Sequence, residues 1–356
     1  MSLRTVMLVG CLLLMSTVAL AGEQIELEQV AVEITNRSIL ANVLKVNLSD
    51  PRVGVRVALG EDRVGGTEDL LHFAQRHGAV AAINGTFFNA YVEGSIKDPV
   101  GTVITGGELV YRGNTGTVFG ITRDKRVRME PVRFKIIGAT DGSYKWPRNW
   151  YAYWINRTAT SANHAGIYTP ARGPRMGVAG GVSVIVQGGT VTGIDSGEQP
   201  IPEDGYVINF QGSEASLGER FAIGTTVEYR VTFADDKPLA GFWAEVAEAL
   251  GVGPKLVTGG EISFSTESAK AEGFTEAKIL SSSYGRSALG ITAAGELLLV
   301  TTGAVTVAEL AQLMQSLGAV EAMNMDGGAS SGLVYQGKYI TEPGRPISNA
   351  LLIFVN

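Results

Sequence analysis

The chain has 356 residues, of which 45% are apolar, so it can bury a sizeable core in one large domain or two smaller ones. Its 29 Lys and Arg side chains nearly balance 35 Asp and Glu side chains, and the sequence has no basic run that would indicate nucleic-acid binding. The 46 glycines, set among short β-branched runs, predict many strands and many turns.

The N-terminus has the pattern of a secretory signal peptide. Arg4 precedes the apolar stretch TVMLVGCLLLMSTV, and Ala19–Ala21 form a small-x-small cleavage site. We therefore expect a signal peptide over residues 1–21 and an exported mature chain, periplasmic or extracellular, over 22–356. A lipoprotein processing site at Leu8–Cys11 is the alternative. Cys11 is the only cysteine, so a chain cleaved after Ala21 has neither disulfides nor thiol chemistry.

The mature chain opens with three alternating segments, which predict strands over residues 25–34, 39–48 and 52–59. A helix is expected next, with Thr67 as its N-cap and Gly78 directly after its last turn. The apolar run AVAAI then predicts a buried strand that ends at Asn84.

A second helix–strand unit lies near the other end of the chain. Thr306 and Glu309 form a T-x-x-E capping box, an apolar helical stripe follows, and Gly318 ends the helix. The next residues, GAVEAMN, match GAVAAIN of the first unit at five of seven positions. The sequence thus predicts two similar units, each delivering an Asn and a Gly-containing loop from a strand end, unless the likeness of two amphipathic units is chance.

The residues between the two units read mostly as strands, with a hairpin at Gly106 and Gly107. A third helix is predicted over residues 239–250, LAGFWAEVAEAL. No linker divides the chain. We therefore predict a single α+β domain over residues 22–356, with mixed β-sheet strands, a few helices, and the two similar helix–strand units meeting at one cleft.

Several familiar chemistries find no support in the sequence. His72 and His77 are five residues apart, which does not place two ligands on one helix face, and His164 stands alone. No His, Cys and Asp cluster has metal-ligand spacing, and no nucleophile elbow, P-loop or dinucleotide fingerprint occurs. We expect no required cofactor, although Asp and Asn oxygens could hold a calcium ion.

Polar residues at the ends of apolar runs are the candidate site. In NGTFF, Asn84 and Gly85 follow a buried strand, and Asn84 could equally be a turn residue. In NMDGGASSG, Asp326 and Gly327 could form a hairpin turn. The following GGASSG is poor strand material, however. The N–H groups of Gly327 and Gly328 with the hydroxyls of Ser330 and Ser331 could instead bind an anion.

Two arginines and one glutamate complete the candidates. Arg286 and Arg345 each begin an apolar strand, and a guanidinium beside a glycine-rich loop suits bidentate phosphate recognition. Glu261 follows Gly259 and Gly260 in GVGPKLVTGGEI, which also reads as a simple hairpin.

Together these motifs resemble the phosphodiester glycosidase family, which includes the lysosomal uncovering enzyme and many exported bacterial proteins. The resemblance runs from about residue 30 to 356, and its ordered motifs are AAINGTFFN, VGPKLVTGGE, GRSALGIT, NMDGGASSGLVYQGK and RPISNALLIF. The family pattern places its Asn-Gly on Asn84 and Gly85, its Arg on Arg286, and its Asp-Gly-Gly on residues 326–328. This chain departs from it at Thr86, Ser287 and Ala329, and a Cβ at Ala329 could narrow a phosphate-binding loop.

The resemblance implies hydrolysis of the C1–O bond of a sugar-1-phosphodiester, which gives free sugar and a phosphomonoester. Asp326 would be the catalytic carboxylate near C1, with Glu261 the second candidate. Arg286 and the Gly327–Gly328 loop would bind phosphate, and Asn84 would orient the sugar or the phosphate. The other residues expected to contact the substrate are Gly85, Ser330 and Arg345. The alternatives are a non-catalytic cell-envelope module that binds glycan phosphodiesters, and a phosphodiesterase that cuts the phosphorus–oxygen bond.

Overall fold

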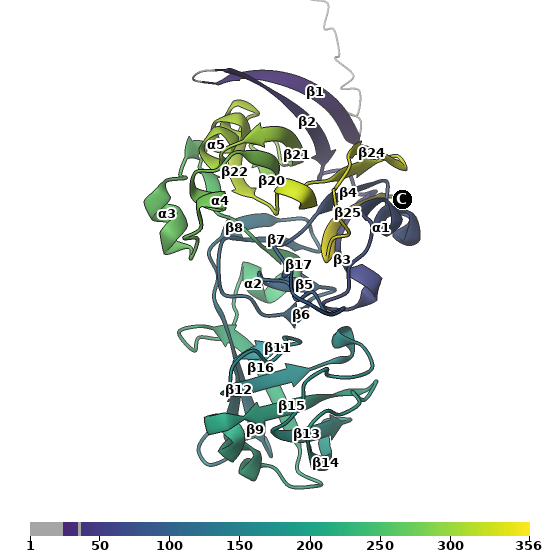
Figure 1. Cartoon of the computed structure of the whole chain (residues 1–356), viewed down its shortest axis with the longest axis vertical. Coiled ribbons are helices and arrows are strands. Elements are labelled where there is room, and N and C mark those ends of the chain that lie inside the picture. The colour runs from purple at the N-terminus through teal and green to yellow at the C-terminus, as the bar shows by residue number, and fades with distance from the viewer. Residues whose placement is uncertain (1–23, 35–36) are drawn as a thin grey trace, which may run out of the picture.

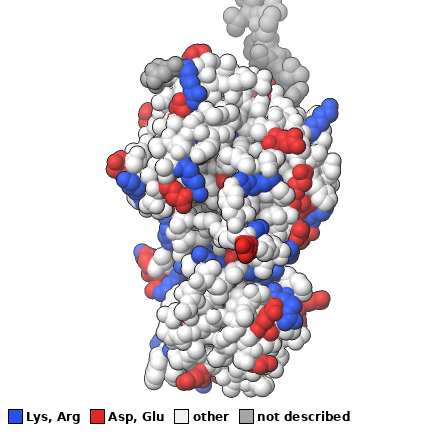
Figure 2. Space-filling view, in the orientation of Figure 1, with Lys and Arg blue, Asp and Glu red and all other residues white. Residues whose placement is uncertain are grey.

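The computed structural model describes residues 24–34 and 37–356, and these form two lobes stacked along the long axis of the molecule (Figure 1). The expected signal peptide, with Cys11, lies outside the described residues. Within residues 24–34 and 37–356, no helix is long and apolar enough to cross a membrane. The face in Figure 2 carries Lys and Arg interspersed with Asp and Glu, with several basic side chains near the waist between the lobes.

Three sheets build the upper lobe. The largest has the order β1 (Ile25–Ile34), β2 (Arg37–Asn47), β21 (Glu296–Val305), β20 (Tyr284–Thr292), β22 (Ala319–Asn324), β18 (Lys255–Thr258), β19 (Glu261–Ile262). The second has the order β24 (Lys338–Thr341), β23 (Leu333–Tyr335), β4 (Ala81–Asn84), β25 (Asn349–Val355), β3 (Val53–Leu59). The third has the order β6 (Glu108–Tyr111), β5 (Val103–Thr105), β17 (Val246–Gly251), β7 (Val118–Thr122), β8 (Val127–Glu130).

Two further sheets build the lower lobe, between residues 134 and 233. One has the order β10 (Asn149–Ala152), β9 (Phe134–Thr140), β16 (Val227–Phe233). The other has the order β11 (Trp154–Ile155), β12 (His164–Tyr168), β15 (Gly205–Gln211), β13 (Val182–Gln187), β14 (Thr190–Ser196). The lower lobe has its own apolar core, which includes Trp150, Ile167 and Phe210.

The helices of the described residues are few and short: α1 (Leu70–His77), α2 (Phe242–Glu245), α3 (Thr266–Ala271), α4 (Ala277–Leu280), α5 (Val307–Ser316), and the 3₁₀ turns η1 (Gly60–Asp62), η2 (Pro170–Arg172), η3 (Gly212–Arg220), η4 (Gly328–Ser330). The predicted capping box of α5 is confirmed. The Thr306 side chain accepts from the amide of Glu309, and the Glu309 side chain accepts from the amide of Thr306. The predicted cap of α1 is wrong: Asp69, not Thr67, accepts from the amides of Leu71 and His72.

The predicted helix over residues 239–250 is also wrong, because only α2 is helical and β17 follows it directly. All six residues of β17 are buried, and the strand pairs with β5 on one side and β7 on the other. Glu248 accepts from the amides of Val57 and Gly106 at 2.9 and 3.1 Å, which fixes it inside the sheet stack. Tertiary pairing has therefore overridden the helix-favouring alanines and glutamates of this segment.

One apolar core holds the three upper sheets together, with Leu289 and Met323 from the first, Ile83 and Leu351 from the second, and Phe119 from the third. A second core lies between the first sheet and α5. The predicted α+β fold is confirmed.

The two similar helix–strand units meet as predicted. In the first unit α1 packs on β4, and in the second α5 packs on β22. Beyond the strand ends, the Asn84 side-chain amide donates to the carbonyl of Asp326 at 2.7 Å, and the amide of Asp326 lies 3.4 Å from the carbonyl of Gly85. These contacts join the two loops that follow β4 and β22.

Candidate functional site

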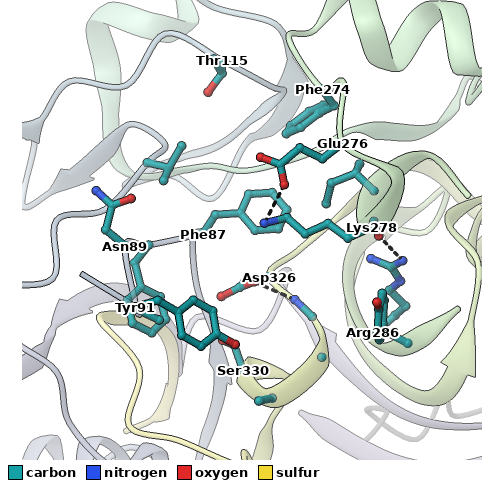
Figure 3. A pocket seen from close by; sticks show the side chains of 18 of the residues that line it. Phe87, Asn89, Tyr91, Thr115, Phe274, Glu276, Lys278, Arg286, Asp326 and Ser330 are labelled. Atoms are coloured by element: carbon teal, nitrogen blue, oxygen red, sulfur yellow. Dashed lines mark hydrogen bonds and ion pairs between the residues drawn. The ribbon is translucent and has the colours of Figure 1, made fainter. Parts of the chain in front are cut away.

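A cavity of about 570 Å³ opens where the loops after β4 and β22 meet (Figure 3). Five parts of the upper lobe line it: residues 87–91 after β4, residues 273–276, 278 and 279 around α4, residues 284 and 286 on β20, residues 326–330 after β22, and the separate side chains Val100, Thr115 and Arg345. The cavity therefore depends on segments from both helix–strand units.

Asp326 lies in this cavity because β22 delivers it there. The strand residues before it are buried, and the amide of Met325 donates to the carbonyl of Ser287 on β20 at 2.9 Å. The Asp326 Oδ1 accepts from the amide of Gly327 at 2.9 Å. Burial raises the pKa of Asp326 to about 6, although the Ser330 hydroxyl, the Gly327 amide and nearby cations favour the charged form. Such a pKa suits a group that exchanges protons near neutrality.

The Gly327–Gly328 loop does not form the hairpin that a D-G pair can also make. The chain instead enters the 3₁₀ turn η4, in which the amide of Ser330 donates to the carbonyl of Gly327 at 3.2 Å. A Cβ on Gly327 would lie 2.8 Å from the carbonyl oxygen of Gly285, so the close approach of these two backbones requires glycine. Gly328 has a φ of +60°, which also favours glycine.

Arg286 is buried, and its guanidinium is held by backbone carbonyls. Its Nε donates to Val305 at 3.2 Å, and its Nη2 donates to Lys278 and Ser282 at 2.8 Å each. Its Nη1 is only 3.7 Å from the point where a Cβ on Gly327 would stand. Burial lowers the pKa of Arg286, but an arginine keeps its charge at neutral pH. A fixed cation thus faces the glycine loop.

Two more cations line the cavity. Arg345 donates through Nη2 to the Tyr91 hydroxyl at 2.6 Å, and its guanidinium lies over the Tyr91 ring, 4.7 Å from the centroid. Lys278, on α4, pairs with Glu276 at 2.7 Å. The sequence alone did not single out Tyr91, Glu276 or Lys278. Glu276 and Lys278 are an acidic and a basic residue two positions apart, a pattern that is common at any solvated helix end.

Aromatic side chains form the apolar part of the cavity wall. Phe87 and Phe274 meet edge to face with centroids 6.0 Å apart, and Phe88, Tyr91 and Tyr284 also line the cavity. Phe87 and Phe88 are the aromatic pair of the motif AAINGTFFN. A pocket with aromatic walls and a few convergent polar groups is typical of small-ligand sites.

Asn84 and Gly85 lie beneath the cavity and do not line it. The Asn84 Oδ1 accepts from the Ser287 hydroxyl at 2.7 Å and from the Gly332 amide at 3.0 Å, so this buried side chain braces the loop that carries Asp326. A Cβ on Gly85 would lie 1.9 Å from the Asn349 Oδ1. Both residues therefore hold the two strand ends together.

The family departures fall on different sides of the cavity wall. The Thr86 hydroxyl is buried and bonds to Asn349 and to the Phe87 carbonyl, away from the cavity. The Ser287 hydroxyl lies 2.8 Å from the Ser331 hydroxyl, and neither residue lines the cavity. Ala329 does line the cavity, next to Ser330. Of the three departures, only Ala329 touches the candidate site.

Glu261 is not brought to the cavity. It lies exposed at the start of β19, directly after the Gly259–Gly260 turn that joins β18 to β19. The segment thus has the simple hairpin form that its glycines also allowed.

No group of three or more His, Cys, Asp or Glu side chains in the described part of the chain is placed to hold a metal ion. The calcium ion considered from the sequence stays an untested prediction.

The fold is α+β, and comparisons with known proteins narrow the class of protein further. The sequence model of the phosphodiester glycosidase family matches residues 180–354. This match confirms the resemblance over that part of the chain, which includes Arg286 and the loop from Asp326 to Ser330, and the matched family is one of hydrolases.

Solved structures share the fold. A hypothetical protein from Synechocystis is 25% identical with a TM-score of 0.81 over 94% of this chain, which spans 62% of that protein. A protein of Burkholderia pseudomallei K96243 named as exported is 23% identical with a TM-score of 0.73, over 89% of this chain and 74% of that one. The third structure is the catalytic domain of zebrafish N-acetylglucosamine-1-phosphodiester alpha-N-acetylglucosaminidase, auto-inhibited by its pro-peptide. It is 14% identical with a TM-score of 0.50, over 94% of this chain and 85% of that one. No curated protein sequence matches the chain.

Proposed function

We propose that the protein is an exported glycoside hydrolase that cleaves the C1–O bond of a sugar-1-phosphodiester. One observation carries this proposal: a desolvated carboxylate, Asp326, shares a single cavity with the cationic side chains of Lys278, Arg286 and Arg345. The family match over residues 180–354 supports the same kind of reaction.

The cations suit the phosphate end of such a substrate. A phosphodiester becomes more negative when it leaves as a phosphomonoester, so fixed positive charge stabilises the departing group. Arg286 meets this requirement because three carbonyls orient its guanidinium before substrate binds. The amides of Gly327 and Gly328 would add donors on the same side, and the Ser330 hydroxyl a further one.

Asp326 suits the sugar end. Cleavage at C1 passes through an oxocarbenium-like transition state, which a nearby carboxylate stabilises. Burial makes the charged form of Asp326 costly in the free protein, as its raised pKa records. Positive charge developing at C1 would remove that cost in the transition state, so the carboxylate interacts more strongly with it than with the ground state.

A non-catalytic module of the cell envelope that binds glycan phosphodiesters in the same cavity is the second candidate. It is favoured by Ala329, which lines the cavity where the family pattern has a glycine, so its methyl group occupies space near the phosphate loop. Export itself is proposed from the N-terminal sequence pattern and is supported by a structural neighbour named as exported.

The test is hydrolysis of a panel of sugar-1-phosphodiesters in oxygen-18 water by the wild type and by Asp326→Asn. Label in the released sugar supports C1–O cleavage, and label in the phosphate supports a phosphodiesterase instead. No turnover of any substrate that binds supports the non-catalytic module. We expect Asp326→Asn to lose hydrolysis while it keeps its fold by circular dichroism, and turnover to survive a metal chelator, because no metal is required in this proposal.

A further inference from the structure

The cavity contains a second carboxylate. Among its lining residues only Asp326 and Glu276 are acidic, and they come from different walls, Asp326 from the loop after β22 and Glu276 from the residue before α4. Figure 3 shows the Lys278 side chain reaching between the two carboxylates. Glu276 is paired with Lys278 at 2.7 Å.

The position of Glu276 is fixed by the backbone around it. Glu276 is the N-cap residue of α4, and its carbonyl accepts from the amides of Ile279 and Leu280 at 2.9 and 3.0 Å. Ile279 is buried, and the carbonyl of Lys278 accepts from the buried Arg286. These contacts anchor the backbone of the short helix and so hold the main chain of Glu276 and Lys278 at the cavity wall.

We propose that Glu276 is the second catalytic carboxylate of the site and the base that activates the attacking water. The inference rests on the proposed function. The water gives a proton to Glu276 while its oxygen bonds to C1, and the C1–O bond to phosphate breaks with its electron pair left on the phosphate oxygen. Asp326 faces the positive charge at C1, and Arg286 with the Gly327–Gly328 loop takes the charge of the departing phosphate. Glu276 then releases the proton to solvent.

The rival interpretation is an ordinary exposed ion pair. Both side chains of the Glu276–Lys278 pair are 64% exposed, and exposed pairs contribute only about 0–1 kcal/mol to stability. A pair of that kind has no effect on the chemical step. The two interpretations therefore differ in kcat and not in stability.

The experiment compares Glu276→Gln with Glu267→Gln on a phosphodiester that the wild type hydrolyses. Glu267 is an exposed residue of α3 that does not line the cavity, so its variant matches the charge change alone. We expect kcat of Glu276→Gln to fall about 100-fold or more, as general-base loss does, with little change in KM or in the urea midpoint. Added azide should restore turnover and give the glycosyl azide, because azide needs no base. Glu267→Gln should behave as the wild type.

A kcat of Glu276→Gln within about threefold of the wild type, a loss confined to KM, or a loss that azide does not restore overturns the assignment of Glu276. The proposed function survives each of these results. A wild type that hydrolyses no member of the panel refutes the proposed function itself, and this inference with it.

Discussion

Asp326 links the candidate chemistry to stability. Its pKa is about 6 in the folded chain, against 3.8 for an ordinary aspartate, because burial disfavours the charged form. The folded state therefore binds more protons than the unfolded state between these values. The contribution of Asp326 to the free energy of unfolding therefore falls as pH rises from about 4 to 6, and it stays lowered above that window.

Replacing Asp326 by Asn should remove this penalty. We expect the variant to gain stability relative to the wild type at pH 8 but not at pH 4. The gain stays below about 3 kcal/mol, because Asp326 is only partly buried and solvent screens part of its charge. Urea unfolding of both proteins at the two pH values measures the difference. An equal change at both pH values would mean that the ionised carboxylate is not disfavoured by the fold.

Which single residues could be predicted depends on what each one contacts. Asp326, Arg286, Gly327, Gly328, Ser330 and Arg345 were all expected from the sequence and all line the cavity. Asn84 and Gly85 were expected to touch substrate, but the structure uses them to join the two strand ends. Local sequence marks a strand end clearly, whereas the side of the loop that faces the cavity is decided by distant partners such as Asn349 and Ser287.

At the scale of elements, the loop between β22 and η4 can approach β20 closely because Gly327 has no side chain. A methyl group there would lie 2.8 Å from the Gly285 carbonyl oxygen and 3.4 Å from the Arg286 Cδ. Neither the backbone nor the carbonyl-bound Arg286 can yield easily, so the loop and the guanidinium must move apart.

We therefore expect Gly327→Ala to lower kcat/KM on a sugar-1-phosphodiester by about tenfold or more, since displacements of this size impair positioning. Gly303→Ala is the control, because Gly303 on β21 has nothing within 4 Å of a Cβ and no positive φ. Steady-state kinetics with both variants decide the point. Equal activity of the two variants would show that the loop adapts at no cost to function.

Elements with a clear periodicity were predictable, and those shaped by their neighbours were not. The alternating strands β1 and β3 and the capped helix α5 were anticipated because their signals lie within their own residues. The pattern of residues 239–250 predicts a helix, but residues 246–251 pair with β5 and β7 and form the strand β17. The helix α4 has four residues, too few for a periodic pattern, although it brings Glu276 and Lys278 to the cavity.

At the scale of the molecule, the lower lobe is tied to the segment that forms one wall of the cavity. Asp98 ends the stretch that begins with the cavity residues Asn89 and Tyr91, and the amide of Asn89 donates to the carbonyl of Asp98 at 3.0 Å. The Asp98 carboxylate pairs at 2.6 Å with Arg172, at the end of η2, and both side chains are almost fully buried. The amide of Thr158 donates to the same carboxylate at 2.8 Å.

Removing one partner of a buried ion pair leaves the other charge without compensation, which costs about 3–5 kcal/mol. We expect Asp98→Ala and Arg172→Ala each to destabilise by this order in urea unfolding, and the double variant to cost clearly less than the two together. The exposed pair of Arg175 and Glu198 in the same lobe is the control, and Arg175→Ala should cost no more than about 1 kcal/mol.

If the Asp98–Arg172 pair also holds the loop that carries Tyr91, the Asp98 variant should raise KM for a phosphodiester with little change in kcat. If the costs of the two single variants add up in the double variant and KM is unchanged, the lower lobe contributes to stability but not to substrate binding.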